Sequence, residues 1–253
     1  MKKTVLLIIA VVLVFLTSAI VSLPAQLVVA QAPLPNQLKI NGVRGTLWQG
    51  QASSVVWQGT QVGNVSWTIQ PLKLLTGHVE ANVRFGRGSD WQMKGRGTVS
   101  YGMSGITLSN FIASMPVEQV VKMAPPLPVP LGLSGPLELS IKQLKYAQPY
   151  CESGRGALVW NTNTIGTPLA DLTVGPVVAD IVCSDNRLEV RGSSDSAQVS
   201  SEFSATLSSA KQYDAKAWFK PQAEFPEALA QQLKWLPSAD AKGQYHFSYK
   251  GRL

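Results

Sequence analysis

Alternation of apolar and polar residues runs through most of the chain after residue 40, and it restricts the fold to strands with one buried face. The clearest segments are 79–85, 137–142, 188–191 and 245–250. Each segment presents an apolar edge to a core and a polar edge to water, as half-exposed antiparallel strands do. The sequence therefore predicts a mainly β protein.

Two short helices are expected to interrupt the strands. Ser114 is a suitable cap for the first, with Pro116 in its first turn, where the missing N–H of proline has no cost. The second begins at Pro226, and its apolar face is formed by Leu229, Leu233 and Leu236.

The two halves of this region resemble each other. Residues 154–160 repeat the pattern of 43–48, Pro226 corresponds to Pro116, and 243–250 correspond to 135–142, at offsets of 108–111 residues. Chance similarity between short strand motifs is the alternative explanation. We predict an internal duplication that builds one elongated, twisted antiparallel sheet from two repeats, each with one short helix.

The first forty residues have a different composition. No charged residue or histidine lies between Lys3 and Lys39, and Thr4 to Leu23 would form an apolar helix of about 30 Å, one hydrocarbon thickness. A cleaved signal peptide and a retained signal-anchor both fit, and the length of the apolar stretch favours the anchor. Lys2 and Lys3 should stay in the cytoplasm, which places the rest of the chain in a bacterial periplasm.

These observations give four expected regions. Residues 1–24 form a cytoplasmic stub and a transmembrane signal-anchor, and residues 25–39 form a periplasmic linker. Residues 40–148 are the first β-rich repeat, and 149–253 are the second.

Cys151 and Cys183 are the only cysteines. In an exported protein an even number of cysteines is typical of structural disulfides, and a reactive thiol pair is the alternative. We expect the two to form a disulfide.

Residues for catalysis or metal binding are scarce. The two histidines, His78 and His246, have no nucleophile motif beside them, and no pair of carboxylates is close in sequence. Two histidines and two cysteines are also few for a zinc site. The sequence predicts no catalytic, cofactor-binding or metal-binding residue.

Glycine and arginine alternate between Gly86 and Gly97, a pattern that superficially resembles a phosphate-binding loop. No helix start follows it, and Gly-Arg-Gly recurs at 154–156, so we interpret these segments as turns between strands. A periplasmic location disfavours nucleic acid. The net charge of +7 falls to 7 − 2 = +5 without Lys2 and Lys3, and this charge of the exported part would attract anionic lipid head groups or acidic partners without specificity.

One block of the sequence resembles a known family. Its residues are Gly45, Thr46, Leu47, Trp48, Gly50 and Ala52. With the short apolar segment before it and the β-rich remainder, this block resembles the protein N family of the bacterial type II secretion system. The resemblance implies an inner-membrane protein with its bulk in the periplasm, without enzymatic activity or a cofactor. It also implies a structural role for these residues.

Three functions follow as hypotheses. The leading one is an accessory inner-membrane component of the type II secretion system that supports export of folded proteins through periplasmic contacts with other subunits. The alternative is an anchored lipid-binding or lipid-transfer protein, because a long sheet with an open apolar face could hold acyl chains. A periplasmic enzyme is the third and least supported hypothesis.

Overall fold

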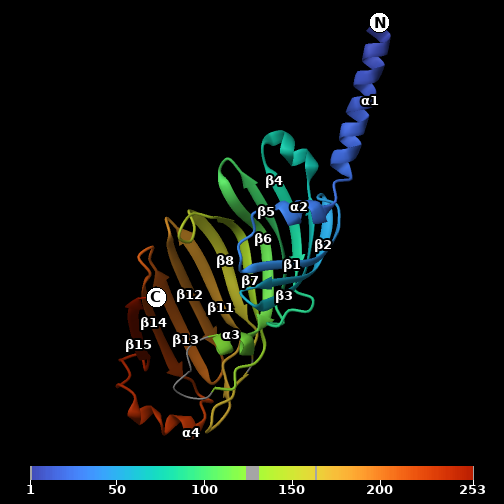
Figure 1. The fold of residues 1–253 in the computed structure, drawn as a ribbon. Coiled ribbons are helices and arrows are strands. Elements are labelled where there is room, and N and C mark those ends of the chain that lie inside the picture. Colours follow the sequence, from blue (N-terminus) through green and yellow to red (C-terminus); the bar gives the residue numbers. More distant parts are fainter. Residues whose placement is uncertain (1, 124–130, 163, 253) are drawn as a thin grey trace.

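One antiparallel sheet of thirteen strands forms most of the molecule (Figure 1). The computed structural model describes residues 2–123, 131–162 and 164–252. The strands follow one another in chain order, and only a small two-stranded sheet, β9 (Thr164–Ile165) with β10 (Leu172–Thr173), stands apart. The prediction of a mainly β fold with one large antiparallel sheet is confirmed.

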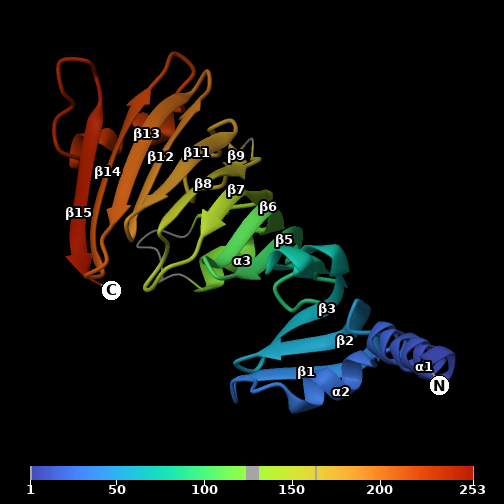
Figure 2. The same cartoon turned by 90° about the horizontal axis from the view of Figure 1, so that it is seen from above.

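We call β1 to β7 the first half of the sheet and β8 to β15 the second half. The strands of the first half are β1 (Leu38–Gly45), β2 (Gln49–Trp57), β3 (Thr60–Ile69), β4 (Val79–Phe85), β5 (Lys94–Gly102), β6 (Gly105–Pro116) and β7 (Pro136–Lys145). The large-sheet strands of the second half are β8 (Ser153–Trp160), β11 (Val177–Ser184), β12 (Arg187–Asp195), β13 (Val199–Leu207), β14 (Gln212–Pro221) and β15 (Tyr245–Arg252). Strand direction turns along the sheet, so β1 and β15 point in very different directions (Figure 2).

The chain begins with the 20-residue helix α1 (Lys2–Val21), and α2 (Ala25–Gln31) follows it. No helix within the described residues has both the length and the apolar character needed to cross a membrane. The expected linker 25–39 is helical in part, because α2 packs on β1 and buries Ala25.

The remaining helices are short. They are the 3-10 helix η1 (Pro71–Thr76), α3 (Val117–Met123), α4 (Glu227–Ala230) and the 3-10 helix η2 (Leu233–Trp235). Ser114 is not a helix cap, because β6 continues through Pro116 and Ser114 pairs with strand residues on both sides. The helix expected after Pro226 exists, but it is divided into α4 and η2.

The two faces of the sheet differ in character, as the alternation predicts. One face carries a row of mostly apolar side chains and glycines in register on ten neighbouring strands. The row is Phe85, Gly95, Ala113, Leu139, Leu158, Ala179, Gly192, Phe203, Ala217 and Phe247. We call this side the apolar face and the other side the polar face.

Aromatic rings cover glycines on the apolar face in both halves. A Cβ atom at Gly95 would lie 2.5 Å from the ring of Phe85, and one at Gly192 would lie 2.4 Å from the ring of Phe203. Gly95 lies inside β5 and Gly156 lies inside β8. The turns predicted at 95–97 and 154–156 are therefore wrong. The segment Gly86–Arg87–Gly88 does lie in a connection between strands.

A disulfide joins Cys151 to Cys183, with their Cα atoms 6.4 Å apart. It links the connection between β7 and β8 to the end of β11. Asn186 supports this connection, because its side-chain oxygen accepts hydrogen bonds from the backbone N–H groups of Tyr150 and Cys151, both at 3.1 Å. Both cysteines are buried.

Candidate functional site

A row of polar and basic side chains crosses the polar face of the first half. Residues on five neighbouring strands lie opposite one another in register, so their side chains share one face. They are Arg44, Gln51, Ser66, Arg84 and Arg96, which we call the arginine row. Alternation placed Arg84 on a polar edge, but no sequence signal indicated that the three arginines would align.

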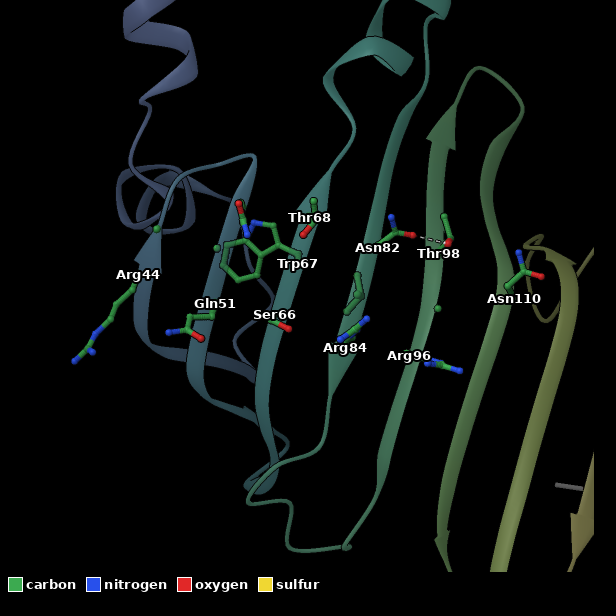
Figure 3. A pocket seen from close by; sticks show the side chains of 15 residues that line it. Arg44, Gln51, Ser66, Trp67, Thr68, Asn82, Arg84, Arg96, Thr98 and Asn110 are labelled. Atoms are coloured by element: carbon green, nitrogen blue, oxygen red, sulfur yellow. Dashed lines mark hydrogen bonds between the residues drawn. The ribbon is translucent and has the colours of Figure 1, made fainter.

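The arginine row lies in a shallow pocket of about 810 Å³ (Figure 3). Amide and hydroxyl side chains also line it, together with Trp67 and Val83. Thr98 donates a hydrogen bond of 2.8 Å to the side-chain oxygen of Asn82. No aspartate or glutamate lines the pocket. Its chemistry is therefore that of an anion-binding surface, with guanidinium groups that match carboxylate or phosphate oxygens in pairs.

The arginines are placed at a cost to stability. Arg84 lies directly opposite Arg96 on the neighbouring strand, and like charges in that position repel. Within the described residues, none of the three arginines of the row makes a salt bridge. All three side chains are exposed, so a partner can reach them.

The corresponding part of the second half has a different charge balance. A pocket of about 630 Å³ on the same face is lined by Asp180 and Glu202 together with Arg191 and Lys216. Asp180 lies opposite Arg191 in the sheet. The positive and negative charges in this pocket balance each other, whereas the charges of the arginine row are all positive.

Two carboxyl groups of the second half are stabilised in their charged form. A hydrogen bond from Lys250 holds the pKa of Asp214 below its ordinary value. The backbone N–H of Gln244, followed by His246, lowers the pKa of Asp240 to about 2. The Nε2 atom of His246 lies 3.0 Å from the Asp240 carboxylate.

The block that carries the family resemblance lies where the sheet meets the N-terminal helix. The indole N–H of Trp48 donates a 2.8 Å hydrogen bond to the carbonyl of Ile20, in the last turn of α1. The backbone N–H of Leu47 donates to the carbonyl of Leu23 at 2.9 Å. Thr46 forms an isolated β-bridge with Pro24, so the block and the N-terminal segment are directly attached.

The other residues of the block shape the hairpin itself. Gly45 has a φ of +91°, and a Cβ atom there would lie 2.5 Å from the carbonyl oxygen of Gln49. Gly50 lies beneath the ring of Trp67, where a Cβ atom would lie 2.5 Å from the ring. Ala52 is almost completely buried.

The histidines lie in separate places. His78 follows η1 and its Nδ1 atom lies 2.7 Å from the carbonyl oxygen of Thr76, whereas His246 lies on β15. Within the described residues no three histidine, cysteine or carboxylate side chains form a group that could hold a metal ion.

The fold and the arginine row define a protein with one long antiparallel sheet, an exposed cationic pocket in its first half and a helix at its N-terminal end. The family model described as type II secretion system (T2SS), protein N, matches residues 36–248. The chain belongs to the type II secretion system protein N family. It is therefore a component of that system, and family membership implies contact with other type II secretion subunits and suggests a location in the cell envelope.

Curated relatives agree with this assignment. The chain is 44% identical over 240 residues to type II secretion system protein N of Vibrio cholerae, covering 95% of each chain. It is 31% identical to the protein of that name in Aeromonas hydrophila, over the whole of both chains. Identity to the Klebsiella pneumoniae protein is 22%, over 94% of this chain and 92% of the relative. No solved structure matches the chain.

Proposed function

We propose that the protein is an accessory component of the type II secretion system that acts by binding and not by catalysis. It is held at the inner membrane by its N-terminal segment and presents the sheet to the periplasm. There the arginine row binds an acidic, extended segment of another subunit. The observation that carries this proposal is the alignment of Arg44, Arg84 and Arg96 in a pocket without a carboxylate.

The shape of the row favours an extended segment over a single small anion. Four inter-strand spacings of about 4.8 Å separate Arg44 from Arg96, a span of about 19 Å. One phosphate group can contact Arg84 and Arg96 but cannot also reach Arg44. An extended peptide at about 3.3 Å per residue covers the row with about six residues.

The membrane attachment is supported by the sequence and by the exposure of α1. The segment from Thr4 to Leu23 has no charged residue, and apolar side chains of α1 that the structure describes, including Leu7, Val11 and Phe15, are exposed. Carbonate extraction of membranes tests this part. Retention in the membrane pellet supports a single-pass anchor, and release into the supernatant contradicts it.

We also propose that the 45–52 block is structural and fixes the direction in which the sheet leaves the N-terminal helix. Two hydrogen bonds support this role, one from Trp48 to the carbonyl of Ile20 and one from Leu47 to the carbonyl of Leu23. The four regions 1–24, 25–39, 40–148 and 149–253 remain our proposal for the organisation of the chain.

Photo-crosslinking in cells tests the proposed contact. A crosslinking residue replaces Ser66, at the centre of the arginine row, and in a matched control it replaces Ser204, in the balanced pocket of the second half. We expect Ser66 to capture a secretion subunit and the capture to disappear when Arg84 and Arg96 are both changed to Gln. Capture that is equal at both positions, or that survives the arginine changes, contradicts the proposal.

The apolar face favours a second candidate function, acyl-chain binding. Its apolar row crosses ten strands, and Ala179 is the one buried member of the row, whereas Phe247 is 43% exposed. Native mass spectrometry of the protein extracted with its lipids tests this function. Stoichiometric lipid adducts that survive mutation of the arginine row would support it.

A further inference from the structure

Four large apolar side chains that are each more than 60% exposed lie at two connections of the first half. Leu72 and Leu75 of η1 are 77% and 86% exposed. Tyr101 and Met103 of the β5–β6 hairpin are also exposed, Met103 completely. Exposed apolar side chains normally occur singly on a soluble protein surface, so a group of four at neighbouring strand ends calls for a partner.

Both connections lie on the edge of the sheet to which α1 is attached. Gln49, next to the turn that contacts α1, pairs with Thr68 at the end of β3, and η1 follows directly. Val79, after η1, pairs with Tyr101, so the β5–β6 hairpin is next in line. We call residues 46–48, 70–78 and 101–105 the α1 edge. Figure 1 shows η1 and this hairpin on the same side of the sheet as the end of α1.

The other described connections of the sheet expose fewer large apolar side chains, which are Leu131, Tyr146, Leu169 and Trp235. On the opposite edge of the first half, residues 58–59 and 86–93 expose Gln58, Arg87, Asp90 and Gln92. On the same edge of the second half, the β11–β12 turn consists of Asp185 and Asn186, and the β13–β14 turn spans residues 208–211. Leu72, Leu75, Tyr101 and Met103, each at least 61% exposed, therefore form the most exposed apolar group on the described connections, and it lies nearest α1.

We infer that the α1 edge is a second membrane contact, and that Leu72, Leu75, Tyr101 and Met103 insert into the lipid surface beside the N-terminal anchor. This inference rests on the anchoring part of the proposed function. With α1 in the bilayer, the hydrogen bonds from Trp48 to Ile20 in α1 and from Leu47 to Leu23 just after it hold the neighbouring connections at the level of the head groups. Leucine, tyrosine and methionine side chains at that level gain free energy by leaving water.

The charges of the α1 edge suit a lipid surface. Residues 70–78 and 101–106 contain no aspartate or glutamate, and Lys73 is their one basic residue apart from His78. Lys73 lies 3.8 Å from Glu80 and is half exposed, so it can also reach anionic head groups. Two contacts with the membrane, one by α1 and one by the α1 edge, would fix the tilt of the whole sheet.

Fluorescence quenching in vesicles tests the inference on the full chain. Single cysteines that replace Leu75, Met103, Val12 or Trp235 are labelled with an environment-sensitive dye, with the native disulfide kept oxidised. The protein is reconstituted into phosphatidylethanolamine–phosphatidylglycerol vesicles that contain a lipid spin-labelled near the head group. Trp235 is the control, because it is 77% exposed but lies far along the chain, after α4.

We expect quenching at positions 75 and 103 to exceed quenching at position 235 several-fold. No quenching at 75 and 103, together with deep insertion at position 12, overturns this inference and leaves the anchor intact. No insertion at position 12 contradicts the anchor itself. Changing Leu72 and Leu75 to Glu should abolish quenching at position 103, and changing Leu169 and Trp235 to Glu should leave it unchanged.

Discussion

The two halves of the sheet share the same strand pattern but differ in the charges on their polar face. The arginine row of the first half has three exposed guanidinium groups and its pocket has no carboxylate, whereas the matching pocket of the second half contains both Asp180 and Glu202 and the basic residues Arg191 and Lys216. The second half is also closed by a disulfide, and the first half is attached to α1. We infer that the second half is built for stability and the first half for contact.

Removing the arginines of the row should have the largest effect. With Arg44, Arg84 and Arg96 all changed to Gln, three charge-assisted hydrogen bonds to the acidic partner are lost. At about 1.5 kcal/mol each, binding of a hexaglutamate peptide should weaken roughly 1,000-fold. Fluorescence anisotropy measures this, with the Arg191→Gln, Lys216→Gln double variant as the control. Equal weakening in both variants would remove the distinction between the halves.

Removing the disulfide should give the next largest effect, and it should concentrate in the second half. Changing Cys151 and Cys183 to Ser opens a loop of about 33 residues, which in the chain-entropy model costs roughly 3–4 kcal/mol of unfolding free energy. Hydrogen exchange should show β11 to β13 losing protection before β3 to β5. Simultaneous loss in both halves would mean that the sheet unfolds as one cooperative unit.

The attachment of α1 should depend on Trp48. The Trp48→Phe variant keeps an aromatic ring but removes the hydrogen bond to the carbonyl of Ile20, which contributes about 1 kcal/mol. Hydrogen exchange at residues 20–47 should rise about fivefold, while the rest of the sheet is unchanged. Trp235→Phe, in the second half, is the matched control and should change exchange at neither place. An unchanged rate in Trp48→Phe would show that the backbone contacts of Leu47 suffice.

Removing a single arginine charge should change the unfolding free energy in opposite directions in the two halves. Arg96→Gln removes the repulsion with Arg84 and should raise the unfolding free energy by a few tenths of a kcal/mol. Arg191→Gln removes an attraction, because its Nη2 atom lies 3.4 Å from the Glu189 carboxylate and Asp180 lies opposite, so it should lower stability by a similar amount. Urea denaturation of both variants measures this. Changes of the same sign would mean that the arginines of the row are compensated after all.

Local patterns in the sequence predict the strands but not this difference between the halves. The alternation at 79–85 and 245–250 identifies β4 and β15, because the side-chain period of a strand is two. The arginine row depends on register across five strands and on irregularities near Ala52 and Gly97, which no local pattern encodes. Arg96 was assigned to a turn because glycines flank it. In the structure, aromatic rings from neighbouring strands cover both of those glycines.

The smallest expected effect is a pH dependence in the second half. The pKa of Asp240 lies near 2 instead of the ordinary 3.8, because Gln244, His246 and Lys242 hydrogen-bond to or attract its charged form. A lowered pKa means that this group stabilises the fold above about pH 4, and that its contribution is lost as the pH falls toward 2. Asp240→Asn lacks the contribution at every pH. The difference in melting temperature between wild type and this variant should therefore shrink between pH 4 and pH 2. A difference that stays constant over this range would show that the Asp240 contacts stabilise the loop before β15 independently of charge.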